Sequence, residues 1–182
     1  RGLGDVYKRQ RQNPTITFFS RDPSKNDYIA ANQITIRNLD KERRCDVVLY
    51  VNGMPLAIIE LKQSGSTATV ESAYNQLRTY VDEFPMAFRF ANIVVASDGI
   101  DAIYGTPFTP REHMSTWRVN DDGEPFEQGP LVVVDGEHMT EFDMLMWGLF
   151  NVERFGQIFV DFTAFDEMDG ELRMRVAKPV SY

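Results

Sequence analysis

Residues 46–62 read DVVLYVNGMPLAIIELK, and this stretch decides the fold. Two apolar, β-branched runs, Asp46 to Val51 and Leu56 to Lys62, predict two strands. They flank Asn52-Gly53, a pair that accepts the positive φ angles of tight hairpin turns. The stretch therefore predicts an antiparallel hairpin at the centre of a β-sheet.

The register of this hairpin decides whether its acidic side chains meet. A two-residue turn without a bulge would put Asp46 opposite Ile59 and separate it from Glu60. A connection of three or five residues, or a bulge, would set Asp46 directly opposite Glu60. Because Pro55 cannot donate a hydrogen bond to a neighbouring strand, we expect the wider turn and the second pairing.

The ends of the two strands carry charges that suit phosphodiester chemistry. Side chains alternate along a strand, so Glu60 and Lys62 share a face and Leu61 points to the other one. An Asp and a Glu that meet can share a divalent cation, and a nearby lysine can orient the attacking water and offset charge on a phosphate. Taken alone, Asp with Glu-x-Lys is a loose pattern, since charges at strand ends are commonly solvated.

The rest of the sequence predicts one α/β domain with a central mixed sheet flanked by helices. Apolar residues at helical spacing predict a helix over Val70–Glu83, begun by Thr67 or Thr69 and stopped by Pro85. We expect further strands at Thr15–Phe19, Gln33–Arg37, Asn92–Ser97 and Ser115–Val119, irregular chain at Ile100–Pro110, a loop at Asn120–Pro130, and helices within Thr140–Phe150 and Val152–Phe162 separated at Asn151.

Composition limits the classes of protein to which the chain can belong. Its 182 residues are 43% hydrophobic and 25% charged, which fits one soluble globular domain with a sizeable core. The apolar runs are far shorter than a membrane span, and the single cysteine, Cys45, cannot form an internal disulfide, so we expect a cytoplasmic protein without membrane contact. The net charge of −8 argues against a general electrostatic grip on DNA, so any DNA contact must be local or helped by a partner.

The two ends differ from the rest of the chain. Residues 5–10 (DVYKRQ) and 180–182 (VSY) look like translated ends of a transposon adapter used to fragment DNA. We therefore expect residues 1–10 and 180–182 to be adapter-derived, and residues 11–179 to be the domain proper. On this reading the chain is a fragment of a longer protein.

The hairpin resembles the catalytic core of the PD-(D/E)xK nuclease superfamily. More closely, residues 46–62 resemble the amino-terminal nuclease domain of the restriction (R) subunit of type I restriction-modification enzymes. Gln76 and Tyr80 match the Q-x-x-x-Y helix of that family, and Val95–Gly99 and Trp117 fall where similar segments occur. The resemblance covers most of residues 32–165 and implies the restriction-endonuclease-like fold.

The resemblance also assigns roles to five residues. It implies that Asp46 and Glu60 bind Mg²⁺, that Lys62 is the catalytic lysine, and that Gln76 and Tyr80 support the site or contact DNA. Both helix residues should then lie on the sheet side of their helix, near Lys62. Without the resemblance, Tyr80 would be an ordinary aromatic at the edge of the core and Gln76 a solvent-facing residue.

The family implies a metal-dependent endodeoxyribonuclease that acts on double-stranded DNA with methyltransferase and specificity subunits. ATP would serve only a motor region outside this chain, which contains no Gly-x-x-x-x-Gly-Lys-Ser/Thr phosphate loop. The sequence departs from the family at Cys45, where proline is usual, and a helix that often contributes another acidic residue would end in the segment expected to be adapter-derived. Two alternatives stay open: a stand-alone repair or junction nuclease, and a non-catalytic DNA-binding or scaffold domain of the same fold.

Overall fold

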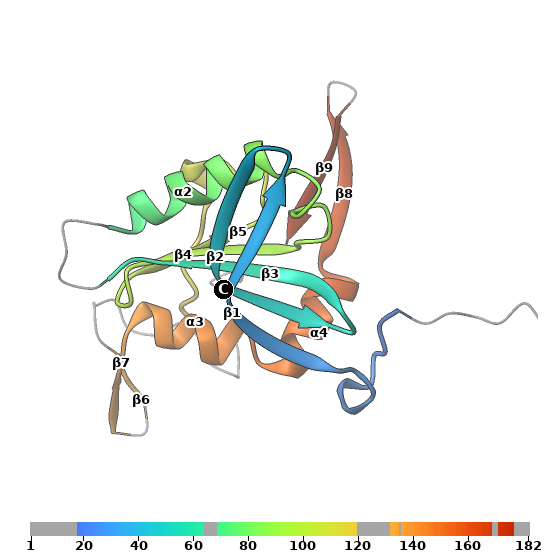
Figure 1. Ribbon diagram of the computed structural model, residues 1–182. Coiled ribbons are helices and arrows are strands. Elements are labelled where there is room, and N and C mark those ends of the chain that lie inside the picture. The colour runs from blue at the N-terminus through green and yellow to red at the C-terminus, as the bar shows by residue number, and fades with distance from the viewer. Residues whose placement is uncertain (1–17, 64–68, 120–131, 135, 169–170, 177–182) are drawn as a thin grey trace, which may run out of the picture.

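The computed structural model describes residues 18–63, 69–119, 132–134, 136–168 and 171–176 (Figure 1). The elements, in chain order, are η1 (Pro23–Lys25), β1 (Tyr28–Asn38), β2 (Lys41–Val51), β3 (Met54–Leu61), α2 (Val70–Glu83), β4 (Ile93–Ser97), β5 (Ala102–Gly105), η2 (Arg111–His113), β6 (Val132–Val134), β7 (Glu137–Met139), α3 (Glu141–Leu149), α4 (Val152–Asp161), β8 (Thr163–Met168) and β9 (Glu171–Val176). No helix in these ranges is long and apolar enough to cross a membrane.

A five-stranded mixed sheet forms the centre of the fold, in the order β1-β2-β3-β4-β5. Strands β3 and β4 are parallel and are connected through α2, whereas the other neighbours are antiparallel. Helix α2 covers one face of the sheet, and α3 and α4 lie against the other (Figure 1). The expected α/β fold with a central mixed sheet flanked by helices is thus confirmed, and it is the restriction-endonuclease-like arrangement.

The turn between β2 and β3 is tighter than predicted. Asn52 and Gly53 have φ angles of 51° and 80°, and Val51 pairs directly with Met54, so the connection has only two residues. The expectation of a wider turn was wrong. Pairs alternate between hydrogen-bonded and non-hydrogen-bonded in an antiparallel ladder, so Pro55, one step beyond the pair at the turn, does not have to donate to β2.

A β-bulge restores the register that the short turn would lose. The pairing of β2 with β3 shifts between Leu49 and Tyr50, and Leu49 lies opposite Ala57. Leu56 is therefore an extra residue in β3, and its side chain is buried. Beyond the bulge, the register carries on toward Asp46 opposite Glu60, which is the pairing that the sequence predicts.

The helices follow their predicted positions closely. Thr69 is the N-cap of α2, and its backbone N–H donates to Ser72 Oγ at 2.8 Å. The helix ends before Pro85, as expected. The break between α3 and α4 is also confirmed, because Asn151 Oδ1 accepts hydrogen bonds from the first turn of α4.

Several strand predictions differ from the structure. Irregular chain was expected at Ile100–Pro110, but Ala102–Gly105 forms β5, which has a buried apolar side and pairs with β4. Ser115–Val119 is not a continuous strand, because it contains only isolated bridge residues, of which Ser115 pairs with Tyr104. The predicted strand at Gln33–Arg37 is part of the longer β1, and the hairpins β6-β7 and β8-β9 were not predicted. Of the strand expected at Thr15–Phe19, residues 15–17 lie outside the described ranges and the last two residues are not in a strand. The loop expected over 120–130 lies entirely outside the described ranges.

The face of the sheet opposite α2 is closed by α3 through a close contact with Trp117. This side chain is 5% exposed, and its indole Nε1 donates to the backbone oxygen of Val119 at 3.1 Å. Gly148 of α3 lies directly against the indole, so that any side chain there would collide with the ring. The close approach of helix and ring therefore depends on glycine at this position.

Candidate active site

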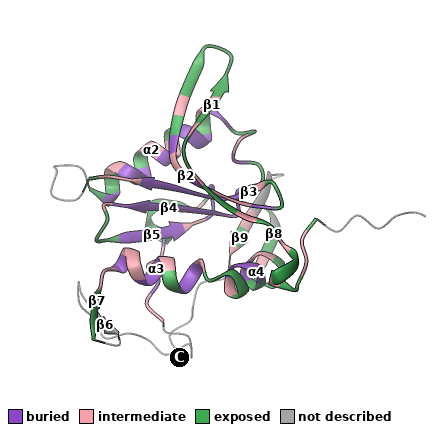
Figure 2. Ribbon diagram, turned by 60° about the horizontal axis from the view of Figure 1, so that its bottom comes forward, coloured by how far each residue is buried: buried purple, intermediate pink, exposed green. Residues whose placement is uncertain are grey.

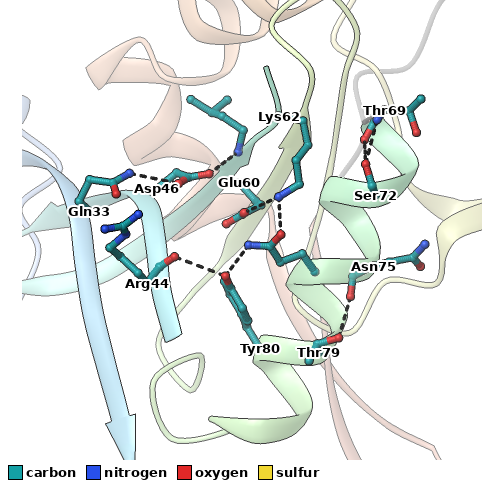
Figure 3. Close-up of polar contacts among 12 residues, drawn as sticks. Gln33, Arg44, Asp46, Glu60, Lys62, Thr69, Ser72, Asn75, Thr79 and Tyr80 are labelled. Atoms are coloured by element: carbon teal, nitrogen blue, oxygen red, sulfur yellow. Dashed lines mark hydrogen bonds and ion pairs between the residues drawn. The ribbon is translucent and has the colours of Figure 1, made fainter. Parts of the chain in front are cut away.

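The two acidic residues predicted to bind metal come together at one end of the β2-β3 hairpin. Asp46 Oδ2 accepts a hydrogen bond from the backbone N–H of Leu61 at 2.9 Å, which holds the carboxylate beside the end of β3 (Figure 3). Its Oδ1 accepts from the Gln33 side chain on β1 at 3.2 Å. Gln33 was missed in the sequence analysis, and its φ of 54° marks a local distortion that no sequence motif indicated.

Glu60 is the buried carboxylate of the pair, with 1% of its surface exposed. Its Oε1 accepts from Lys62 Nζ at 3.0 Å, whereas Oε2 has no hydrogen-bond partner among the residues that the structure describes. Burial raises the pKa of Glu60 to about 7, the Lys62 hydrogen bond opposes that shift, and the nearby charge of Asp46 adds to it. An ionised Glu60 would therefore be stabilised by a cation placed between the two carboxyl groups.

The donor set fits a hard divalent cation. Within the described ranges, no group of three or more His, Cys, Asp or Glu side chains is arranged to hold a metal ion. Two carboxylates alone are nevertheless a common protein contribution to Mg²⁺ binding, with waters and substrate phosphate oxygens completing the shell. The unsatisfied Oε2 of Glu60, beside Asp46, is the atom that such an ion would bind.

Lys62 is held in place by helix α2. Its Nζ also donates to Gln76 Oε1, and the Gln76 amide nitrogen donates to the hydroxyl of Tyr80 one helical turn later (Figure 3). The Tyr80 hydroxyl in turn donates to the backbone oxygen of Arg44 on β2 at 3.4 Å. Burial raises the pKa of Tyr80, so the phenol stays protonated and remains a donor.

The position predicted for Gln76 and Tyr80, on the sheet side of their helix and near Lys62, is thus confirmed. The amide oxygen of Gln76 accepts a hydrogen bond from the ammonium group of Lys62. The chain of hydrogen bonds fixes the ammonium group at the point where it faces Glu60.

Cys45, beside the first acidic residue, packs as a small apolar side chain. It is 1% exposed and belongs to the core under α2. Burial raises the pKa of its thiol to about 11, with smaller contributions from Glu60 and Asp46. The thiol is therefore neutral at physiological pH and unsuited to be a nucleophile.

Comparison with known proteins identifies the family. Residues 5–113 match the family described as type I restriction enzyme R protein N terminus; this range begins inside the segment 1–10 expected to be adapter-derived. The MjaIXP endonuclease subunit of Methanocaldococcus jannaschii, named as a type I restriction enzyme, is 30% identical over 154 residues, 79% of this chain. The type I restriction enzyme HindI endonuclease subunit of Haemophilus influenzae is 34% identical over 99 residues, 53% of this chain.

The similar region is a small part of each relative. It spans 15% of the Methanocaldococcus protein and 9% of the Haemophilus protein. The type I restriction enzyme EcoprrI endonuclease subunit of Escherichia coli is 36% identical over 76 residues, which are 40% of this chain and 24% of that protein. Because the family match covers more than half of the chain, this chain belongs to the family of amino-terminal domains of type I restriction enzyme R proteins.

Proposed function

We propose that this chain is a Mg²⁺-dependent endodeoxyribonuclease domain that hydrolyses phosphodiester bonds of double-stranded DNA. The observation that carries the proposal is the buried Glu60, which has one oxygen on Lys62 and the other without a partner in the described part of the chain, next to Asp46. A buried, partly unsatisfied carboxylate is costly for a fold and is typical of a functional site. The family supports the nuclease role in general.

Each residue of the proposed site has a distinct task. Asp46 and Glu60 would hold the cation, with Asp46 kept in place by Gln33 and by the backbone of Leu61. When bound, Mg²⁺ activates a water and offsets charge on the phosphate. The Lys62 ammonium, anchored through Gln76, would donate to the attacking water or to a phosphate oxygen and stabilise the negative charge that develops there.

The setting of this reaction is a second part of the proposal. The relatives are named as endonuclease subunits of type I restriction enzymes, so we place the domain in the restriction of foreign DNA in the cytoplasm, with methyltransferase and specificity subunits. ATP would be used by a motor elsewhere in the R subunit. A net charge of −8 opposes binding of a polyanion, so these partners would supply most of the grip on DNA.

A plasmid cleavage assay tests the proposal. The 182-residue chain is incubated at high concentration and low salt with supercoiled DNA and Mg²⁺ or Mn²⁺. We expect slow nicking that requires the metal and is lost in Lys62→Ala. The control is Glu112→Gln, because Glu112 is exposed on η2 and forms no hydrogen bond or ion pair with Asp46, Glu60 or Lys62 in the described part of the chain. Circular dichroism checks that each variant is folded.

The outcomes separate the alternatives. Equal cleavage by Lys62→Ala and by the unsubstituted chain would contradict the assigned role of the lysine. Rapid cutting that does not respond to salt would favour a stand-alone nuclease. DNA binding without cleavage under any divalent metal would favour the non-catalytic alternative.

A further inference from the structure

The outer half of the β1-β2 hairpin extends beyond the main sheet, and it begins at the proposed active site. Strand β2 pairs with β3 only over Val47–Val51, whereas it pairs with β1 as far as Lys41. Figure 2 shows this two-stranded arm projecting from the body of the domain, with exposed residues along it. Asp46 lies at its base, so a polymer bound at the site would pass close to the arm.

The arm is rich in basic residues, but most of them already have acidic partners. Arg37 forms an ion pair with Glu42 across the two strands. Lys41 and Arg43 both bind Glu83 at the end of α2, at 3.2 and 2.9 Å. These three cations are thus largely neutralised by the protein itself, and pairing with Glu83 also fastens the arm to the helix.

Arg44 is different from its neighbours. Its side chain is exposed, and over the described ranges it has no ion pair and no side-chain hydrogen bond. The guanidinium of Arg44 is therefore accessible to an anionic ligand. Arginine is well suited to phosphate, because its planar group donates two parallel hydrogen bonds.

The position of Arg44 relative to the site is fixed by geometry. It precedes Asp46 by two residues on β2, which places the two Cα atoms about 7 Å apart. Gln33, the residue that donates to Asp46, lies on the neighbouring strand β1 (Figure 3). The backbone oxygen of Arg44 accepts from Tyr80, which connects its main chain to the hydrogen bonds that hold Lys62.

We infer that Arg44 binds a DNA backbone phosphate that neighbours the phosphate attacked at the proposed site. The inference rests on the proposed function for the identity of the polymer, and it adds a substrate-binding residue that the hairpin motif does not contain. A bidentate contact at this point would align the DNA strand along the arm and compensate part of the repulsion between the backbone and the two carboxylates.

Arg44→Gln is compared with Arg89→Gln as a matched control. Arg89 is also exposed and likewise has no ion pair within the described ranges, but it lies beside Met54, at the opposite end of β3 from Glu60. Each substitution removes one positive charge, so a difference in DNA affinity between the two variants reflects the position of the lost charge and not the net charge. Arg44→Lys keeps the charge and loses the planar group.

The assay measures binding of a fluorescent DNA duplex to the chain by polarisation, in EDTA, at salt concentrations from about 50 to 200 mM. We expect Arg44→Gln to weaken binding about tenfold at the lowest salt and to reduce the slope of log affinity against log salt by about 0.9. Arg89→Gln should leave the slope unchanged, and Arg44→Lys should keep most of the slope.

Two results would overturn the inference: equal slopes for Arg44→Gln and Arg89→Gln, or no measurable binding by the unsubstituted chain even at the lowest salt. Because EDTA removes the metal, cleavage does not enter this measurement. The nuclease proposal can fail while the inference on Arg44 holds. In that case Arg44→Gln would still reduce the slope of log affinity against log salt, but the unsubstituted chain would show no metal-dependent nicking.

Discussion

Glu60→Gln should make the protein more stable at alkaline pH, although it removes a residue of the proposed site. Glu60 is 1% exposed, and burial is the main reason that its pKa rises from an ordinary 4.5 to about 7. A raised carboxyl pKa means that folding favours the protonated form. The stability contributed by this group is therefore fully present below pH 4.5 and is lost as the pH rises through 7.

The magnitude follows from the two pKa values. Relative to a neutral side chain, the ionised Glu60 lowers the free energy of unfolding by about 3 kcal/mol at pH 8 and by about 1 kcal/mol at pH 5. Glutamine has nearly the same shape and keeps an oxygen that can accept from Lys62. The stability advantage of Glu60→Gln should therefore grow by about 2 kcal/mol from pH 5 to pH 8.

Urea denaturation of both proteins at the two pH values, in EDTA, measures this advantage. Comparing the variant with the unsubstituted chain at each pH cancels the contributions of the other titrating groups. The reasoning would be refuted if the advantage of Glu60→Gln stayed constant, or if the unsubstituted chain became the more stable protein at pH 8.

Three further predictions concern the metal, the thiol and the helix packing. Mg²⁺ at pH 8 should raise the melting temperature of the unsubstituted chain but not that of Asp46→Ala or Glu60→Gln, because an ion that binds only the folded state stabilises it. An equal shift in all three proteins would argue against Asp46 and Glu60 as metal ligands. The buried Cys45, with a pKa of about 11, should react with a thiol reagent at pH 8 only after the chain is unfolded, and fast labelling of the folded protein would contradict the packing described above. Gly148→Ala should lower the free energy of unfolding by about 1 to 3 kcal/mol, because the new methyl group collides with the Trp117 ring. Alanine usually stabilises a helix, so an increase in the free energy of unfolding, measured by urea denaturation, would show that the ring can move aside.

Local patterns were enough to predict the hairpin and α2. The Asn52-Gly53 turn and the helical spacing that ends at Pro85 are short-range signals, and the structure follows both. The register that carries β2 and β3 toward Asp46 and Glu60 was predicted with the wrong turn, because the short turn is combined with a bulge and not replaced by a longer connection. The sequence shows which strand register would bring the two acidic residues together. The position of a β-bulge, however, depends on packing on both faces of the sheet.

The missing elements depend on partners distant in the sequence. Strand β5 is only four residues long and is recognisable because it pairs with buried β4, while the glycine and prolines around it resemble a loop. Gln33 donates to Asp46 from the neighbouring strand β1, and its own φ is positive, a local conformation that no spacing rule anticipates. Lys62 was correctly linked to α2 only because the family resemblance supplied the Q-x-x-x-Y helix.

The bulge at Leu56 has a consequence for insertions and deletions among related chains. Because β3 contains one residue more than the ladder needs, a deletion at this point could straighten the strand and still leave Glu60 opposite Asp46. An insertion of one residue between Leu56 and Glu60 cannot be accommodated by removing the bulge. It would turn Glu60 to the other face of the sheet unless a second bulge formed. Length variation between the two acids should therefore be asymmetric: shortening by one residue is compatible with the site, whereas lengthening by one is not.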